Sequence, residues 1–302
     1  MLRHAVPPTL QVPVVPRARA TPKAPFGLPE VRATLAAAVP ALGLTEHHVA
    51  TARVVQVVST AVLEVAGLAV KIYPFGTDPA RLSAQGRAVS TADGLWVAPV
   101  AAPVETAHGV AVAYPWLPPA EPVSWAEVGR LLRIWHSMPV DPTDLPRWTP
   151  LRRLPDQVAA YAARPDADPG LVRVALAARD ALLARVDNLT SDLGTGVIHG
   201  DVSPANVLRR DGRPVLIDSD FVAVGPLEYD LVSAAQRRER GDIDEGEYLA
   251  FCDAYGYDVR SWPGLGLVEE ICSLGAVTFR LWCGVQRGED VSWLGAALAR
   301  YA

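Results

Sequence analysis

The sequence has few cysteines and no long apolar segment. Its three cysteines, Cys252, Cys272 and Cys283, form an odd number without metal-type spacing, which predicts reduced thiols in a cytoplasmic protein. No run approaches the roughly 18 apolar residues that a membrane-spanning helix requires. Residues 1–27 contain no acidic residue and no continuous apolar core of a secretory signal. We therefore expect a flexible, proline-rich tail over 1–27 and no membrane partner.

Several catalytic signatures are also absent. No GxxxxGK[ST] phosphate loop, GxSxG or HExxH sequence occurs, which excludes ordinary P-loop proteins and the most recognisable hydrolases. The formal net charge of −5 argues against a nucleic-acid partner and is compatible with a cationic substrate. Because 50% of the residues are hydrophobic and 20% are charged, we expect a globular protein of one or two domains.

A predicted hairpin organises the stretch VIHGDVSPANVLRRDGRPVLIDSD at 197–220. The Asp-Gly pair at 211–212 is a strong signal for a two-residue turn between antiparallel strands. Arg210 then faces Arg213, and each earlier residue faces one equally far along the second strand. The polar residues that flank the two strands therefore meet at the open end of the hairpin.

Three oxygen-bearing side chains are expected at this open end: Asp201, Asn206 and Asp218. Kinase-type phosphoryl transfer uses such a set, in which one Asp accepts the proton of the acceptor hydroxyl while an Asn and a second Asp hold Mg²⁺. Each residue alone would more often serve as a turn or cap. Their combined spacing instead predicts Asp201 as the catalytic base and Asn206 and Asp218 as metal ligands.

The same stretch resembles the aminoglycoside phosphotransferase family, whose members are small-molecule kinases with a protein-kinase-like fold. The matching residues are His199-Gly200-Asp201, Asn206-Val207-Leu208, Leu216-Ile217-Asp218, Gly225-Pro226 and Asp230-Leu231. The resemblance is specific over 197–232 and looser over about 50–300. It implies an α+β, bilobal fold with a small antiparallel-sheet N-terminal lobe and a mainly helical C-terminal lobe. It also implies that His199 supports the catalytic loop and that Asp230 braces it.

The chain is expected to divide into the tail, an N-terminal nucleotide-binding lobe at 28–115 and a C-terminal catalytic and substrate-binding lobe at 116–302. The sequence pattern predicts N-lobe strands at 53–65 with a break at 59–60, then at 68–73, 96–100 and 109–114, and helices at 28–42 and 79–92. It predicts C-lobe helices from 124 to about 138 and at about 169–186, 227–238, 244–255, 265–284 and 290–300.

Lys71 is the mid-strand lysine of a chain that otherwise has lysine only in its tail. It lies in the third predicted strand, where kinases place the lysine that contacts the α- and β-phosphates. A surface lysine is the alternative. Kinases pair this lysine with a glutamate on the next helix, but the matching position here is Gln85, which can hydrogen-bond Lys71 without neutralising it. Glu64 is a weaker substitute.

The remaining nucleotide contacts are predicted from the strand order. No glycine-rich loop precedes Lys71, so we expect the turn at Ser59 and Thr60 to contact phosphate through hydroxyls and backbone N–H groups. The hinge at 111–117, centred near Ala113, would turn its backbone toward the base. Asp220, two residues after Asp218, could be a second metal ligand, but a turn cap is favoured.

We therefore expect an ATP- or GTP-dependent phosphotransferase that uses Mg²⁺ and acts on a small hydroxylated compound, an aminoglycoside or a related metabolite. An aminoglycoside acceptor would imply antibiotic resistance and a cationic substrate, for which the acids between Glu239 and Asp258 are candidate contacts, although a solvated acidic face is the simpler explanation. A monomer or a dimer is expected. The alternative is a catalytically weak, nucleotide-binding regulator, which Gln85 alone supports.

Overall fold

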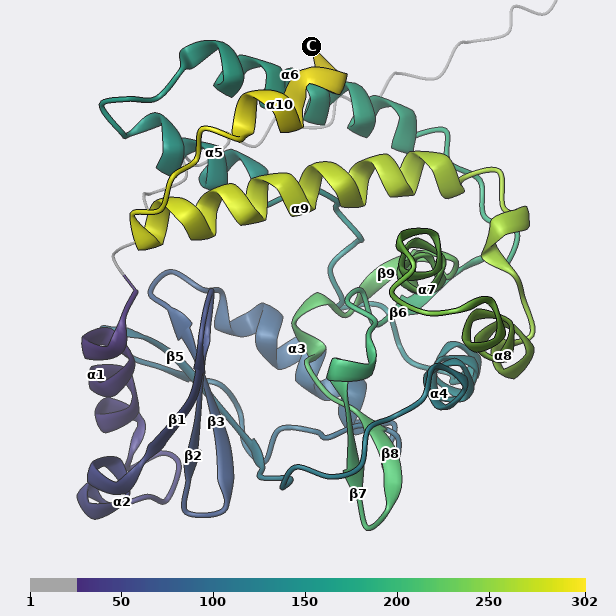
Figure 1. Cartoon of the computed structure of the whole chain (residues 1–302). Coiled ribbons are helices and arrows are strands. Elements are labelled where there is room, and N and C mark those ends of the chain that lie inside the picture. Colours follow the sequence, from purple (N-terminus) through teal and green to yellow (C-terminus); the bar gives the residue numbers. More distant parts are fainter. Residues whose placement is uncertain (1–25) are drawn as a thin grey trace, which may run out of the picture.

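The computed structural model describes residues 26–302. The tail predicted over 1–27 thus lies, apart from its last two residues, outside the described residues. The chain folds into an antiparallel five-stranded sheet with flanking helices, followed by a mainly helical part, in agreement with the predicted α+β class. Figure 1 shows the sheet at one side of the molecule and most helices at the other. The division at residue 115 stays a prediction.

The sheet has the order β1-β2-β3-β5-β4. Its strands and first three helices are β1 (Arg53–Val57), β2 (Ala61–Val65), β3 (Leu68–Pro74), β4 (Val104–Glu105), β5 (Gly109–Pro115), α1 (Leu28–Ala38), α2 (Glu46–Thr51) and α3 (Pro79–Ser90). Alternate side chains of β2 are buried, because successive residues of a strand point to opposite faces. Val31 and Leu35 of α1 pack on one face with Leu63 and Val70, while α3 lies on the side of the helical part (Figure 1).

The strand predicted at 96–100 is wrong. Trp96 forms an isolated bridge to Leu216, far along the chain, and the fourth strand of the sheet is the short edge strand β4. Val97 donates its N–H to the carbonyl of Leu216 at 2.9 Å, and Val100 donates to that of Ala113 at 2.8 Å. Pro99 interrupts the segment because it has no N–H for a strand ladder. The segment therefore connects the sheet to the C-terminal part.

The C-terminal part is built from seven helices of four or more residues within the described chain, together with two two-stranded sheets. The helices are α4 (Trp125–Ser137), α5 (Leu154–Ala162), α6 (Pro169–Val186), α7 (Tyr229–Arg240), α8 (Glu245–Tyr255), α9 (Leu265–Arg287) and α10 (Leu294–Leu298). The strands are β6 (Thr195–Ile198), β7 (Val207–Arg210), β8 (Arg213–Leu216) and β9 (Ala223–Pro226). The prediction missed α2 and α5, both short, and placed the other helices within a few residues of their ends.

Two hydrophobic cores support this part. One joins α4, α7 and α8 to the strands around residues 197–224 and contains Trp96 and Trp135. The other joins α5, α6 and α10 to α9, which Figure 1 shows as the long helix running across the molecule beneath them. The predicted capping box at the start of α4 is present, since Ser124 Oγ accepts from Glu127 N–H and Glu127 Oε2 accepts from Ser124 N–H. Among residues 26–302, no helix combines the length and apolar character needed to cross a membrane.

Candidate active site

The β7–β8 hairpin has the predicted turn and register. Arg210 pairs with Arg213 and Val207 with Leu216. The turn residues Asp211 and Gly212 have φ of 52° and 76°, the positive values that a tight turn of this hand requires. Just beyond the paired strands, Ile217 N–H donates to the carbonyl of Asn206 at 3.0 Å. Local sequence alone therefore places Asn206 beside Asp218, as expected.

Asp230 braces the loop that precedes the hairpin. This residue is 2% exposed and lies in the first turn of α7. Its Oδ2 accepts from His199 N–H at 2.6 Å, and its Oδ1 accepts from Gly200 N–H at 2.8 Å. His136 Nε2 lies 3.0 Å from the same Oδ2. The bracing role implied by the family resemblance thus has a direct structural basis.

The loop is also held from its other sides. His199 Nε2 lies 3.1 Å from the carbonyl of Ile217, and its ring stacks on Trp96 at 4.9 Å between centroids. Gly200 has a φ of +82°, and an added Cβ would lie 2.4 Å from the carbonyl oxygen of Phe221. No other residue type fits this position without displacing the backbone. His199 therefore supports the loop, as expected, and Asp201 projects from a rigid turn.

Asp201 and Asn206 are in direct contact. Asn206 Nδ2 donates to the backbone carbonyl of Asp201 at 2.7 Å, which orients the amide so that its Oδ1 points away from this bond. Partial removal of the Asp201 carboxylate from water raises its pKa above the ordinary value, and the negative charge of Asp218 raises this pKa further. The amide oxygen of Asn206 and the carboxylate of Asp218 are hard oxygen donors of the type that Mg²⁺ prefers. The donor set fits the predicted metal.

Lys71 joins the sheet to this site across 147 residues of sequence. Its Nζ lies 2.8 Å from Asp218 Oδ1 and 2.9 Å from Asp220 Oδ2. Burial lowers the pKa of Lys71, but Asp220 and Asp218 outweigh burial and raise it above its ordinary value. Burial likewise opposes ionisation of Asp218, and Lys71 overcomes this effect and lowers its pKa. Lys71 is thus a charged, largely buried lysine and not a surface lysine.

Gln85 and Glu64 do not pair with Lys71, contrary to the expectation. The buried amide nitrogen of Gln85 donates to the carbonyls of Asp220 and Val222, each at 2.9 Å. Glu64 forms an ion pair with Arg53 on the neighbouring strand. The acid that accompanies Lys71 in place of a helix glutamate comes from the segment after the hairpin. The kinase pattern places this acid on α3, so the sequence did not identify Asp220 in this role.

Asp220 is therefore not a turn cap. It lies in a 3₁₀ turn (Ser219–Phe221), is 8% exposed, and accepts from Tyr73 Oη at 2.6 Å besides contacting Lys71. Burial and then Asp220 raise the pKa of Tyr73 well above its ordinary value, so this hydroxyl remains a donor. Tyr73 went unnoticed in the sequence, although it lies two residues after Lys71 and thus on the same strand face.

A cavity of about 650 Å³ brings most predicted site residues together. Its lining includes Asp201, Asp218, Lys71, Ser59 and Thr60. Gln85 lines a smaller neighbouring hollow of about 370 Å³. Asn206 and Ala113 line neither. The Ala113 side chain packs in the core against α1, and the Ala113 carbonyl accepts from Val100 N–H. Contact of the Ala113 backbone with a nucleotide base stays a prediction.

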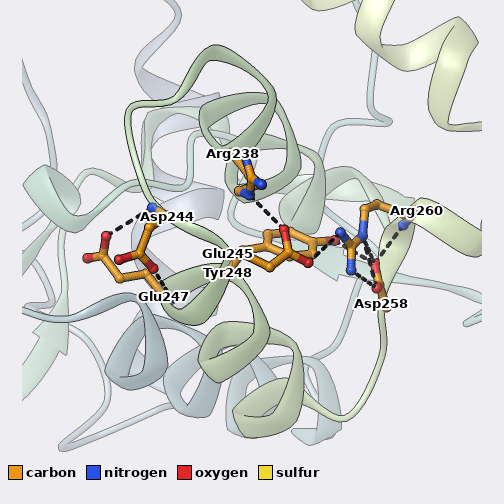
Figure 2. A network of polar contacts seen from close by, with 7 residues as sticks. All are labelled: Arg238, Asp244, Glu245, Glu247, Tyr248, Asp258 and Arg260. Atoms are coloured by element: carbon orange, nitrogen blue, oxygen red, sulfur yellow. Dashed lines mark hydrogen bonds and ion pairs between the residues drawn. The ribbon is translucent and has the colours of Figure 1, made fainter.

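Four of the acids between Glu239 and Asp258 make the polar contacts at α8 that Figure 2 shows: Asp244, Glu245, Glu247 and Asp258. Glu245 pairs with Arg238 and Arg260, and Asp258 accepts from Tyr248 Oη at 2.6 Å. None of these acids lines either cavity. Their position outside both cavities agrees with the simpler expectation of a solvated acidic face.

Known proteins share this architecture. The model of the phosphotransferase enzyme family matches residues 47–267. Comparison with curated protein sequences found no match. Among solved structures, a choline/ethanolamine kinase family protein from Mesorhizobium loti has a TM-score of 0.57 and 18% identity, with 90% of this chain and 91% of that chain covered.

Two further solved structures are also similar. An amicoumacin kinase, solved with AMP-PNP, Ca²⁺ and Ami, has a TM-score of 0.59 and 14% identity, over 85% of this chain and 87% of that chain. An aminoglycoside phosphotransferase from Streptomyces rimosus has a TM-score of 0.54 and 18% identity, over 81% and 98% respectively. At these identities the structures establish the shared fold, and the family model establishes membership. The chain therefore belongs to the phosphotransferase enzyme family, which includes the aminoglycoside phosphotransferases that its motif resembles, and is a small-molecule kinase that phosphorylates a hydroxyl group.

Proposed function

We propose that this kinase transfers the γ-phosphate of ATP or GTP to a hydroxyl of a small organic molecule, in the cytoplasm. One observation carries the proposal. Asp201 and Asp218 from the segments that flank the β7–β8 hairpin and Lys71 from β3 line a single cavity. The solved relatives that hold AMP-PNP or ADP support a nucleotide as the co-substrate.

In the proposed reaction, Asp201 accepts the proton of the acceptor hydroxyl while the oxygen of that hydroxyl bonds to the γ-phosphorus. The bond from that phosphorus to the bridging oxygen breaks, and the nucleoside diphosphate leaves. Asn206 and Asp218 would hold Mg²⁺, which neutralises phosphate charge. Lys71 would position the α- and β-phosphates, with Ser59 and Thr60 above them.

The raised pKa of Asp201 suits a base, because a stronger base takes up the hydroxyl proton more readily. The two backbone N–H bonds to Asp230 keep the loop in place, so that Asp201 does not have to be ordered during the reaction. The alternative of a weak regulator loses its support, since Gln85 serves the backbone of the 220–222 segment instead of replacing a lost acid.

The test is nucleoside diphosphate release with Mg²⁺ and ATP or GTP over a panel of small alcohols. Asp201→Asn should lower acceptor-dependent turnover by about 10²–10⁴-fold while nucleotide binding persists. Asp144→Asn is the matched control, because Asp144 is an exposed partner of Arg87 outside the cavity. Full activity of Asp201→Asn would contradict the proposal, as would tight nucleotide binding without transfer to any acceptor.

A further inference from the structure

Four arginines line the cavity around the proposed reaction centre. Arg81 comes from α3, and Arg147, Arg152 and Arg153 come from the segment between α4 and α5. Among residues 26–302, no ion pair involves any of these four. Most ion pairs elsewhere among residues 26–302 join an arginine to a carboxylate, as between Arg185 and Glu270. No carboxylate of the described residues therefore lies within ion-pairing distance of these four arginines.

Contacts with neighbouring groups position three of the four guanidinium groups. Arg153 lies over the ring of Phe221 at 4.7 Å and Arg152 at 5.6 Å, measured to the ring centroid. Phe221 directly follows Asp220, so Arg152 and Arg153 are held next to the ion pairs that Lys71 forms with Asp218 and Asp220. Arg81 donates to the carbonyl of Asp220 at 3.2 Å. Burial and then the charge of Arg153 lower the pKa of Arg81, which indicates that the two like charges lie close together.

The backbone around these arginines is unusual as well. Leu151, just before Arg152, has a φ of +56°, a conformation that a bulky side chain rarely adopts. The preceding segment is anchored, since Trp148 N–H donates to the carbonyl of Val224 at 2.8 Å. Such conformations gather at ligand-binding sites, where surrounding contacts enforce them.

The carboxylates of the cavity do not balance these cations. Asp201, Asp218 and Asp220 lie at the reaction centre, and two of them already contact Lys71. In the neighbouring hollow, Asp78 caps α3 through a bond to Ala80 N–H, and Asp156 is exposed. The arginine fork matches the paired oxygens of a carboxylate or a phosphate.

We propose that the acceptor carries an anionic oxygen group, a carboxylate or a phosphate, that Arg152, Arg153 and Arg81 bind while its hydroxyl lies at Asp201. The inference rests on the proposed kinase function and names the substrate class of the same site. Trp148, Tyr229 and Phe279 line the same cavity and would face the carbon skeleton. On this proposal the acceptor is anionic instead of cationic, since none of the acids between Glu239 and Asp258 lines the cavity.

The experiment uses probes that differ in one substituent: glucose, glucosamine, glucuronate and glucose 6-phosphate, and likewise glycerol, glycerate and glycerol 3-phosphate. Binding to the full chain saturated with Mg·ADP is measured by calorimetry, and each probe is also assayed as an acceptor with Mg·ATP. We expect at least tenfold tighter binding of an anionic member than of its neutral and cationic counterparts. Comparing glucuronate with glucose 6-phosphate, and glycerate with glycerol 3-phosphate, separates a carboxylate from a phosphate site.

Variants identify the binding groups. Arg152→Gln with Arg153→Gln should weaken the anionic probes at least tenfold and leave the Kd of Mg·ATP within twofold. Arg185→Gln, an exposed arginine outside the cavity, should change neither. Arg152→Lys should give an intermediate loss, because it keeps the charge but not the fork.

The inference would be overturned by no preference for the anionic probes, including no binding of any. It would also be overturned by a loss of Mg·ATP affinity alone in the double variant, which would assign the arginines to the nucleotide. Phosphorylation of neutral or cationic probes alone would also overturn it while leaving the proposed function intact. Absence of transfer to every acceptor, with anion binding preserved, would instead contradict the proposed function only.

Discussion

At the scale of single residues, the exchange between Gln85 and Asp220 is the feature that departs most from a simple kinase pattern. The acid beside Lys71 comes from the segment after the β7–β8 hairpin, and the amide on α3 holds the backbone of that same segment. The positive charge of Lys71 is therefore balanced without an acid on α3. An amide suits position 85 because it can donate to two carbonyls, which a carboxylate cannot.

Gln85→Glu should weaken the protein, although a comparison of motifs alone predicts a gain. The ionised side chain would face two carbonyl oxygens in a site that is 1% exposed. We expect the free energy of unfolding to fall by at least about 2 kcal/mol and turnover to decrease. Urea unfolding and kcat measure both effects. Gln85→Met, which loses the bonds without adding charge, should cost less; higher turnover at unchanged stability in Gln85→Glu would contradict this account.

At the scale of elements, the network in Figure 2 links α7, α8 and the segment before α9. Its central carboxylate, Asp258, accepts from Arg260 and from the buried Tyr248. The hydrogen bonds from Arg260 lower the pKa of Asp258 to about 2. The network thus stabilises the packing of these helices on each other and has no part in the cavity.

Asp258→Asn should lower the free energy of unfolding by about 1 kcal/mol at pH 7, a modest value because the ion pair is partly exposed to solvent. The folded-state pKa is below the ordinary value of 3.8. The stabilisation is therefore complete above about pH 4 and is lost as the pH falls through about 2. Urea unfolding at pH 7, 4 and 3 measures the difference in the free energy of unfolding between the wild-type protein and Asp258→Asn. Asp253→Asn, an exposed control on α8, should show no difference; a difference independent of pH would refute the assignment.

At the scale of the whole molecule, Lys71 is the charged link between the sheet and the helical part. In Figure 1, β3, which carries Lys71, belongs to the sheet, while the segment with Asp218 and Asp220 follows the β7–β8 hairpin. The ammonium group of Lys71 contacts both carboxylates and offsets their mutual repulsion. Nucleotide phosphates would enter this same junction.

Lys71→Met should therefore destabilise the free protein as well as inactivate it. Removing the ammonium leaves two partly buried, mutually repelling carboxylates, and we expect a loss of about 2–4 kcal/mol in the free energy of unfolding near neutral pH. Protonation of the carboxylates should reduce this loss as the pH is lowered. Unfolding curves at pH 7 and pH 4 test this, with Lys71→Arg as the charge-preserving control. Unchanged stability of Lys71→Met would show that the ion pairs contribute little.

The sequence by itself determined the elements whose structure depends on near neighbours. The Asp211-Gly212 turn set the register of β7 and β8, and with it the adjacency of Asn206 and Asp218, because a two-residue turn leaves a single pairing. The capping box of α4 and most helix positions were predictable for the same reason. The motif from His199 to Asp218 further indicated the family and its fold.

Only the tertiary structure decided the contacts between distant segments. The partner of Lys71, the task of Gln85, the bridge of Trp96 to Leu216 and the gathering of four arginines each join residues far apart in the chain. Residue spacing predicts local geometry, whereas these contacts depend on how the sheet and the helices pack. The charge of the cavity, and hence the proposed class of acceptor, follows from that packing, while the net charge of the whole chain does not predict it.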